Sequence, residues 1–269
     1  MMPSPLPVLF SSAAFFARPL SWTFQLAAEC GYQGVEVMVT KDSESQDPAR
    51  IRALAGEFGL TVGALHAPCL LLTRKVWGTD PIGKIDRSVE TAADAGIPVV
   101  VVHPPYRWQR AFRRWLIEDL PSLEERTGIA VAVENMFPVR LAGRDVTFHS
   151  NQDLEALEDL PHLVLDTSHA AVAKHDPIAV RKLFGDRLRH VHLSDNAGKG
   201  WDSHLPPGQG VLDLDRFLED LAASEFDGAV SLEVDLRPSL GDAEALATTM
   251  IDMRERTERA LASAGRAAR

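Results

Sequence analysis

Residues 163–169 read Leu-Val-Leu-Asp-Thr-Ser-His, so a short apolar run leads directly into a run of polar side chains. Short runs that are rich in Val and Leu and nearly free of charge are typical of strands covered on both faces, as in a parallel sheet. Such runs recur at residues 7–10, 34–38, 61–65, 98–102, 130–133, 163–165, 190–193 and 229–234. The sequence therefore predicts eight parallel strands.

Helical patterns fill the segments between these runs. They cover residues 22–30, 48–58, 81–95, 110–127, 151–159, 176–184, 213–224 and 242–262. The first four are followed directly by Gly31, Gly59, Gly96 and Gly128, as expected of helix C-termini. Alternating strands and helices leave two architectures, a closed barrel or a large doubly wound sheet. No Gly-rich dinucleotide fingerprint follows the first strand, so we predict an α/β fold with a single (β/α)₈ TIM barrel spanning residues 1–269.

Length and composition agree with one globular barrel. The chain has 269 residues, 45% of them hydrophobic and 25% charged, and such barrels typically have about 250 residues. A formal net charge of -10 gives little support for binding a polyanion, which relies on Lys and Arg. We find no secretory signal, no run of the roughly 20 apolar residues that a membrane span needs, and only Cys30 and Cys69. We therefore expect a cytoplasmic protein without a membrane partner.

Polar side chains stand where the predicted strands end, which is where barrels of this type form their active sites. Six successive strands end in a His, Asp or Glu, namely His66, His103, Glu134, Asp166, His192 and Glu233. A single residue of this kind would be explained as a hydrogen-bonded loop histidine or a helix cap. Six of them converge on one mouth, where gathered carboxylates repel one another and lose solvation. A divalent cation resolves this conflict, so the sequence predicts a metal site.

The ligand types narrow the choice of metal. Imidazole with carboxylate suits Zn²⁺, Mn²⁺, Co²⁺ or Fe²⁺, whereas Ca²⁺ and Mg²⁺ prefer oxygen ligands alone. We expect Zn²⁺ or Mn²⁺ first and keep Co²⁺, Fe²⁺ and Mg²⁺ as alternatives. Of the other histidines, His149, His162 and His175 are expected to be structural or to face solvent. His190, one layer below His192, is expected to be packed and hydrogen-bonded.

Five segments carry a resemblance to a known superfamily. They are GVEV at 34–37, VEN at 133–135, DTSH at 166–169, HVHLSD at 190–195 and DSHLPPGQG at 202–210. From Val8 to about Met253 the sequence resembles the xylose isomerase-like TIM barrels. That superfamily includes sugar phosphate isomerases/epimerases, ketose 3-epimerases, hydroxypyruvate isomerases and the apurinic endonucleases of family 2.

The resemblance implies a set of ligands. By similarity to the isomerases and epimerases, the principal metal would be held by Glu134, Asp166, His192 and Glu233. His169 would then bind substrate or a further metal. The endonuclease branch has four more ligand positions, which match His66, His103, Asp202 and His204. The sequence departs from the family pattern at two places. Residues 194–198 lack the basic residue that is usual in ketose epimerases. Gln209 stands where many relatives have Glu, and we expect this residue to lie next to the metal ligands without binding the metal.

The leading functional hypothesis is a metal-dependent isomerase or epimerase of a small sugar, a sugar phosphate or a related hydroxy-carbonyl compound. Glu134 and Glu233 would act as base and acid on the two faces of the substrate, through a metal-stabilised enediolate. Candidates for binding the substrate are Glu36, Trp77 and Trp108, and His66, His103 and His169 would bind its hydroxyls or phosphate. The alternative for Glu36 is a buried salt bridge to a neighbouring loop, and for each Trp it is surface packing.

Two other functions stay open. The first is phosphodiester hydrolysis by a zinc-dependent enzyme like the apurinic endonucleases. A DNA-binding loop needs basic and intercalating residues, but residues 39–46 contain only one basic residue, Lys41, beside the acidic Asp42 and Glu44. Residues 107–114 contain four arginines, which could bind DNA or could simply lie on a helix surface. The second is a barrel that only binds a ligand, against which the filled ligand set argues. We therefore expect a small-molecule partner rather than nucleic acid, and we leave a homo-oligomer open.

Overall fold

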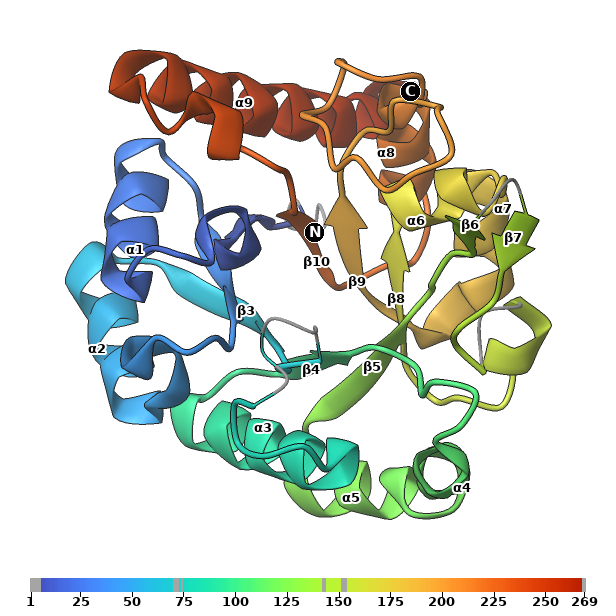
Figure 1. The fold of residues 1–269 in the computed structure, drawn as a ribbon. Coiled ribbons are helices and arrows are strands. Elements are labelled where there is room, and N and C mark those ends of the chain that lie inside the picture. The colour runs from blue at the N-terminus through green and yellow to red at the C-terminus, as the bar shows by residue number, and fades with distance from the viewer. Residues whose placement is uncertain (1–5, 70–72, 74, 142–143, 151–153, 268–269) are drawn as a thin grey trace.

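A computed structural model describes residues 6–69, 73, 75–141, 144–150 and 154–267. The chain forms a closed barrel of eight parallel strands with the helices arranged outside it (Figure 1). Around the barrel the strands follow the order β1-β2-β3-β4-β5-β8-β9-β10 and then return to β1. Their bounds are β1 Val8–Ser11, β2 Gly34–Met38, β3 Thr61–His66, β4 Val99–Val102, β5 Ala130–Glu134, β8 Leu163–Asp166, β9 Leu188–Leu193 and β10 Ala229–Leu232. The predicted α/β class and (β/α)₈ TIM barrel are confirmed.

The helices lie between successive strands along the chain. Their bounds are α1 Leu20–Glu29, α2 Pro48–Phe58, α3 Pro81–Ala95, α4 Arg110–Glu118, α5 Leu120–Thr127, α6 Thr167–Val172, α7 Pro177–Phe184, α8 Leu214–Ala222 and α9 Ala243–Ala267. Local chemistry fixes their ends: Asp47 caps α2 and Asp80 caps α3 through backbone amides, and Gly59 and Gly96 close these helices in the left-handed conformation. None of the described helices is long and apolar enough to cross a membrane.

Two predicted helices differ in the structure, and two further elements were not predicted. The helix predicted at 110–127 is divided into α4 and α5 at Asp119, because Pro121 in the first turn of α5 has no amide to continue the hydrogen-bond ladder. The helix predicted at 151–159 begins outside the described residues, and its described part contains a 3₁₀ turn, Leu154–Leu157. The short helix α6 and the antiparallel hairpin of β6, Val139–Leu141, and β7, Arg144–Val146, were not predicted.

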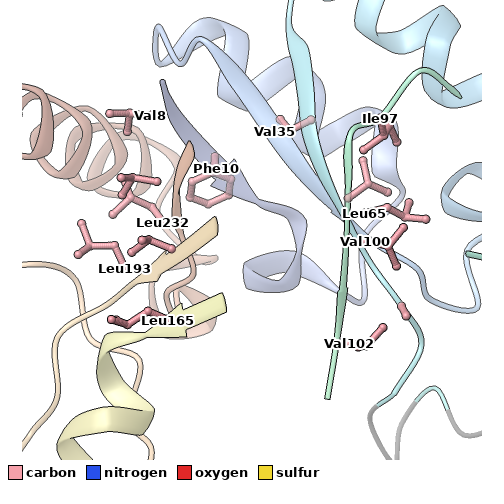
Figure 2. Close-up of a cluster of buried hydrophobic side chains, with 14 of the residues drawn as sticks. Val8, Phe10, Val35, Leu65, Ile97, Val100, Val102, Leu165, Leu193 and Leu232 are labelled. Carbon is pink, nitrogen blue, oxygen red and sulfur yellow. The ribbon is translucent and has the colours of Figure 1, made fainter. Parts of the chain in front are cut away.

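The apolar core lies mainly between the barrel and the helices. Alternate strand residues such as Phe10, Leu65, Val100, Leu165 and Leu232 belong to this outer layer (Figure 2). The opposite faces of the strands point into the barrel, where a small cluster is formed by Ala64, Val99, Val101, Ala132 and Val164. Because side chains alternate along a strand, the residue two positions after each of these points inward as well. This alternation brings His66, Glu134 and Asp166 to one level above the cluster.

Gly34 shows how closely β2 approaches its neighbours. A Cβ atom at this position would meet the hydroxyl and the carbonyl oxygen of Thr61 on β3 and would lie 2.9 Å from Leu9 Cδ2 on β1. We expect Gly34→Ala to lower the free energy of unfolding by about 1–3 kcal/mol, because a backbone atom cannot move aside cheaply. The measurement is urea unfolding followed by circular dichroism. Gly56→Ala, on α2 with no atom within 4 Å of the added Cβ, is the matched control and should stabilise by about 0.5–1 kcal/mol. Equal effects at both sites would contradict this account of the barrel.

Candidate metal centre

Four side chains from four strand ends meet at the carboxyl end of the barrel. Glu134, Asp166, His192 and Glu233 each offer one ligand atom, and these atoms all lie within 4.8 Å of one another. His192 Nδ1 is central, at 3.0 Å from Glu134 Oε1, 2.8 Å from Glu233 Oε2 and 3.9 Å from Asp166 Oδ2. The four residues that the sequence predicts as the principal ligands are therefore brought together.

Two carboxylate oxygens in this group have no hydrogen-bond partner among the described residues. They are Glu134 Oε2 and Asp166 Oδ2, and both are buried. Histidine nitrogens lie 3.2–3.9 Å from these oxygens without forming a hydrogen bond, and a buried charged oxygen that accepts no hydrogen bond is costly. Three carboxylates and one imidazole nitrogen that converge at this spacing form a donor set suited to a borderline divalent cation. The residues present thus fit a metal ion.

A buried carboxylate below the mouth fixes the orientation of His192. Glu36 on β2 has no exposed surface, and His192 Nε2 lies 3.1 Å from both of its oxygens. His190 Nε2 lies 2.6 Å from Glu36 Oε2. Donation from Nε2 to Glu36 leaves His192 Nδ1 turned toward the centre, an arrangement that in metal sites fixes the tautomer of the ligand. The structure places Glu36 in a buried ion pair, which was the alternative to substrate binding, although its partners lie on β9 and not on a loop. His190 is buried and hydrogen-bonded as expected, and with Glu36 and His192 it forms a further compact group of possible ligand atoms.

Burial and charge shift the pKa values of these groups strongly. Burial alone would raise the pKa of Glu134, but His169 and His192 together bring it well below its ordinary value. Burial would lower the pKa of His192, but Glu233, Glu36 and Glu134 raise it well above the ordinary value. For Asp166, burial prevails over the attraction of His169 and raises the pKa to about 6. The carboxylates thus make the mouth a place where positive charge is strongly favoured.

Two further histidines reach the other oxygen of Glu134. His103 Nε2 lies 3.2 Å and His66 Nε2 3.9 Å from Glu134 Oε2, and the three residues form a second compact ligand group. His66 Nδ1 donates to the carbonyl of Ala67 at 2.9 Å, which leaves Nε2 to face the carboxylate. Glu134 therefore stands between two groups, with one oxygen toward each.

A third group lies on the other side of Asp166. Asp166, His169 and His204 have ligand atoms within 4.8 Å of one another. Asp202 Oδ2 lies 2.7 Å from His204 Nε2 and 3.3 Å from His169 Nε2. The Nδ1 atoms of the two histidines donate to the carbonyls of Glu233 and Asn135. The five residues that the sequence gives as further ligands or substrate contacts, His66, His103, His169, Asp202 and His204, are all brought to the mouth.

Asp195 is a site residue whose role the sequence analysis missed. Its buried carboxylate accepts four backbone amides of the following loop, from Asn196, Gly208, Gly210 and Leu212, at 2.8–3.0 Å. This loop carries Asp202 and His204, so Asp195 fixes the third ligand group from below. The only signal was an Asp after β9 ahead of the glycine-containing segment at 202–210. Gln209 is exposed on this loop.

Two cavities open from the mouth. One, of about 670 Å³, is lined by Glu233 and His204 together with Phe16, Arg18 and Lys41. The other, of about 590 Å³, is lined by His103 and Trp108 among others. Trp108, which the sequence analysis gives as a candidate for binding the substrate, therefore lines a cavity next to the mouth.

The remaining predicted residues have structural or surface positions, although the ring centroid of His149 lies 6.4 Å from that of His103. For Trp77 the structure agrees with the alternative interpretation, packing rather than substrate binding. Its side chain packs against the core, and the Arg87 guanidinium lies 5.0 Å from its ring centroid. His149 donates from Nδ1 to the carbonyl of Pro104, His162 lies 2.6 Å from Glu124, and His175 is exposed. These three histidines are structural or face solvent, as predicted.

The fold and the site define a (β/α)₈ barrel with a cluster of histidines and carboxylates at its carboxyl end. The model of the family described as xylose isomerase-like TIM barrel matches residues 24–256. The chain therefore belongs to this family, as the resemblance of the five segments indicated.

Individual relatives extend the comparison. An uncharacterized protein of Mycobacterium tuberculosis is 37% identical over 251 residues, covering 85% of this chain and 89% of its own. Fructoselysine 3-epimerase of Shigella flexneri is 22% identical over 241 residues, covering 80% and 85%.

Solved structures share the fold. A D-tagatose 3-epimerase-like protein has a TM-score of 0.75 at 21% identity, covering 98% of this chain and 100% of its own. The IOLI protein with a binding zinc atom has a TM-score of 0.69 at 20% identity, covering 96% and 99%.

Removing the charge of Asp195 should loosen the loop that it anchors. Asp195→Asn leaves one acceptor oxygen and turns an amide donor toward backbone amides, so we expect the free energy of unfolding to fall by about 2–3 kcal/mol. Urea unfolding measures the loss. Asp235→Asn is the control, because Asp235 pairs with the exposed Arg237 on the surface and should change stability by less than about 1 kcal/mol. A similar small change for Asp195→Asn would remove it as the anchor of the loop.

His149 should make stability depend on pH. Burial, and then the neighbouring His103, lower the pKa of His149 to about 4, whereas it is about 6.5 in an unfolded chain. The unfolded chain therefore takes up a proton first, so the stability from neutral His149 is present above pH 6.5 and is lost as the pH falls toward 4. Between pH 7 and pH 5.5 we expect the chain to lose about 1 kcal/mol more than His149→Asn, which keeps a donor for Pro104. Parallel pH profiles of the two proteins in urea unfolding would rule this out.

Proposed function

We propose that this chain is a divalent-metal-dependent isomerase or epimerase of a small sugar or sugar phosphate. The observation that carries the proposal is the group of Glu134, Asp166, His192 and Glu233 at the mouth of the barrel, where two buried carboxylate oxygens accept no hydrogen bond from the described residues. The names of the relatives support the substrate class, since one is a fructoselysine 3-epimerase and a D-tagatose 3-epimerase-like structure shares the fold. Residues 194–198, directly after β9, contain no basic residue, which argues against substrate handling like that of the ketose epimerases.

The same four residues would hold the metal. The zinc atom of the IOLI structure, which has the same fold, supports Zn²⁺, and the donor set also suits Mn²⁺, Co²⁺ or Fe²⁺. When bound, the cation would act as a Lewis acid that polarises a substrate carbonyl. Glu36 would keep His192 Nδ1 aimed at the centre from below.

Glu134 and Glu233 are the proposed acid–base pair. Their carboxylates approach His192 Nδ1 from two strands, β5 and the end of β10, at 3.0 and 2.8 Å. In the proposed reaction one carboxylate accepts the proton on the carbon next to the substrate carbonyl, and the other returns a proton on the opposite face. Glu233 also lines the larger cavity, which gives it direct access to the substrate. Glu134 is enclosed, with His66, His103 and His169 around it to bind hydroxyls.

The larger cavity fits a sugar or sugar phosphate. Its lining joins apolar side chains such as Phe16 and Met38 to the cationic side chains of Arg18 and Lys41. Hydroxyls could bind near His204, and a phosphate could bind near the two cations, because charge-assisted hydrogen bonds to such groups are strong.

A second candidate function is metal-dependent phosphodiester hydrolysis. One observation favours it: four groups of possible ligand atoms adjoin, and Glu134, Asp166 and His192 each belong to two of them, as in a multi-metal centre. A surface depression lined by Arg107, Arg110, Arg113 and Arg114 adds positive charge near the β4 end. The net charge of -10 and the acidic neighbours of Lys41 weigh against a nucleic-acid substrate.

Metal analysis followed by proton NMR of candidate ketoses in D₂O separates the two functions. We expect bound divalent metal and deuterium at the carbon next to the carbonyl. Glu134→Gln and Glu233→Gln should each lower the exchange rate by at least about 100-fold while the circular dichroism spectrum is unchanged. Glu225→Gln, an exposed carboxylate far from the mouth, should keep the full rate. Nicking of a duplex with an abasic site, without exchange into any ketose, would overturn the isomerase proposal in favour of the second candidate.

A further inference from the structure

The smaller cavity lies beside the metal centre and takes no part in the chemistry described so far. It has a volume of about 590 Å³ and lies between α3, the segment after β4 and the segment after β5. His103, 3.2 Å from Glu134, belongs to its lining. Phe137, on another side, has its ring centroid 4.6 Å from that of His169. The cavity is therefore next to two of the predicted ligand histidines, within reach of a substrate bound at the mouth.

Aromatic rings make up a large part of the lining. Besides His103, they are Tyr106, Trp108, Phe112, Phe137, Phe148 and His149. Trp108 and Tyr106 are stacked with centroids 4.7 Å apart and planes at 1°, and Tyr106 is stacked on His149 at 4.5 Å. Trp108 remains 67% exposed although it is stacked on one side. A large flat side chain with this much open surface at a cavity is a surface that favours binding of another flat ring.

The stack is held in place before any ligand binds. Arg107 N donates to the Phe148 carbonyl, Ser150 N donates to the Pro105 carbonyl, and Tyr106 N donates to Gln109 Oε1, all at 2.8–2.9 Å. His149 Nδ1 donates to the Pro104 carbonyl at 2.7 Å. These bonds fix the segment after β4 against the segment that carries Phe148 and His149. A ligand ring would therefore meet a preformed surface and would spend little free energy on ordering it.

Charge distinguishes this cavity from the larger one. None of the described residues in its lining carries a carboxylate. Its one lysine, Lys84, is buried and donates from Nζ to the carbonyls of Pro68 and Thr73 at 2.8 and 3.1 Å. The larger cavity, by contrast, is lined by several charged side chains of both signs. The smaller cavity is thus suited to an uncharged group.

We infer that the substrate is a sugar conjugate, with its sugar at the metal centre and an uncharged aromatic ring in the smaller cavity against Trp108. This inference rests on the proposed function and narrows its substrate class from free sugars to aryl-substituted ones. The aromatic ring supplies binding free energy at a distance from the reacting carbon. Such remote binding positions the sugar at the catalytic groups.

The test compares two probes that differ only in the ring, phenyl β-D-glucopyranoside and methyl β-D-glucopyranoside. Binding to the full chain is titrated by calorimetry, which needs no turnover. We expect the phenyl glucoside to bind about tenfold more tightly than the methyl glucoside, as ring stacking and burial predict. In Trp108→Ala this advantage should fall to about twofold or less. Trp201→Ala, which removes another exposed Trp outside the cavity lining, should keep the tenfold advantage.

Three results would overturn the inference. They are equal binding of the two glucosides, no measurable binding of the phenyl glucoside, and an advantage that persists in Trp108→Ala. If the third result is accompanied by a change of oligomeric state in Trp108→Ala, seen by sedimentation, the ring surface is assigned to a second copy of the chain. Failure of the proposed function is recognised separately, because deuterium exchange into ketoses is measured on the unaltered chain and does not depend on the phenyl group.

Discussion

The arrangement of side chains at the mouth of the barrel depends on the repulsion between buried carboxylates that the strand ends bring together. Glu134, Asp166 and Glu233 converge on His192, and Glu36 lies directly below. Water cannot solvate these groups, so their charge must be balanced by cations. In the chain alone the histidines supply that balance, which is why the pKa of His192 lies well above its ordinary value. The ligand set, the Glu36 pair and the cluster around Asp202 are all consequences of this one requirement.

The barrel meets the requirement through the alternation of side chains along each strand. The inner face of β5 carries Ala132 and then Glu134, and that of β8 carries Val164 and then Asp166. Ala64, Ala132 and Val164 share the lower level with the Glu36–His190 pair, so the upper level is closed from below and open at the carboxyl end. The outer face of the same strands packs against the helices. Along each strand, alternate residues therefore point outward to stabilise the fold or inward, where the last of them carry the chemistry.

Much of this arrangement could be predicted from the sequence, because both signals are local. Apolar runs mark the strands, and the residue at the end of each run faces the mouth whatever the details of packing. What the sequence could not give depends on contacts between distant segments. The four amides that bind Asp195 come from up to 17 residues further along the chain, and Glu36 finds its partners 154 and 156 residues away on β9. The break at Asp119 was signalled by Pro121, but the apolar period across it continued and favoured one helix.

The two sides of the mouth differ in a way that bears on the substrate. Glu233 opens on a cavity with charged side chains, whereas Glu134 is enclosed by histidines and borders the side where the aromatic cavity lies. A small free sugar would need only the first cavity. The preformed aromatic surface of Trp108, stacked on Tyr106 and largely exposed to water, contributes burial free energy only when a ligand or partner covers it. Since hydrogen bonds hold this surface in place next to His103, a ligand that spans both cavities explains why it is built there, and a ligand confined to the first cavity does not.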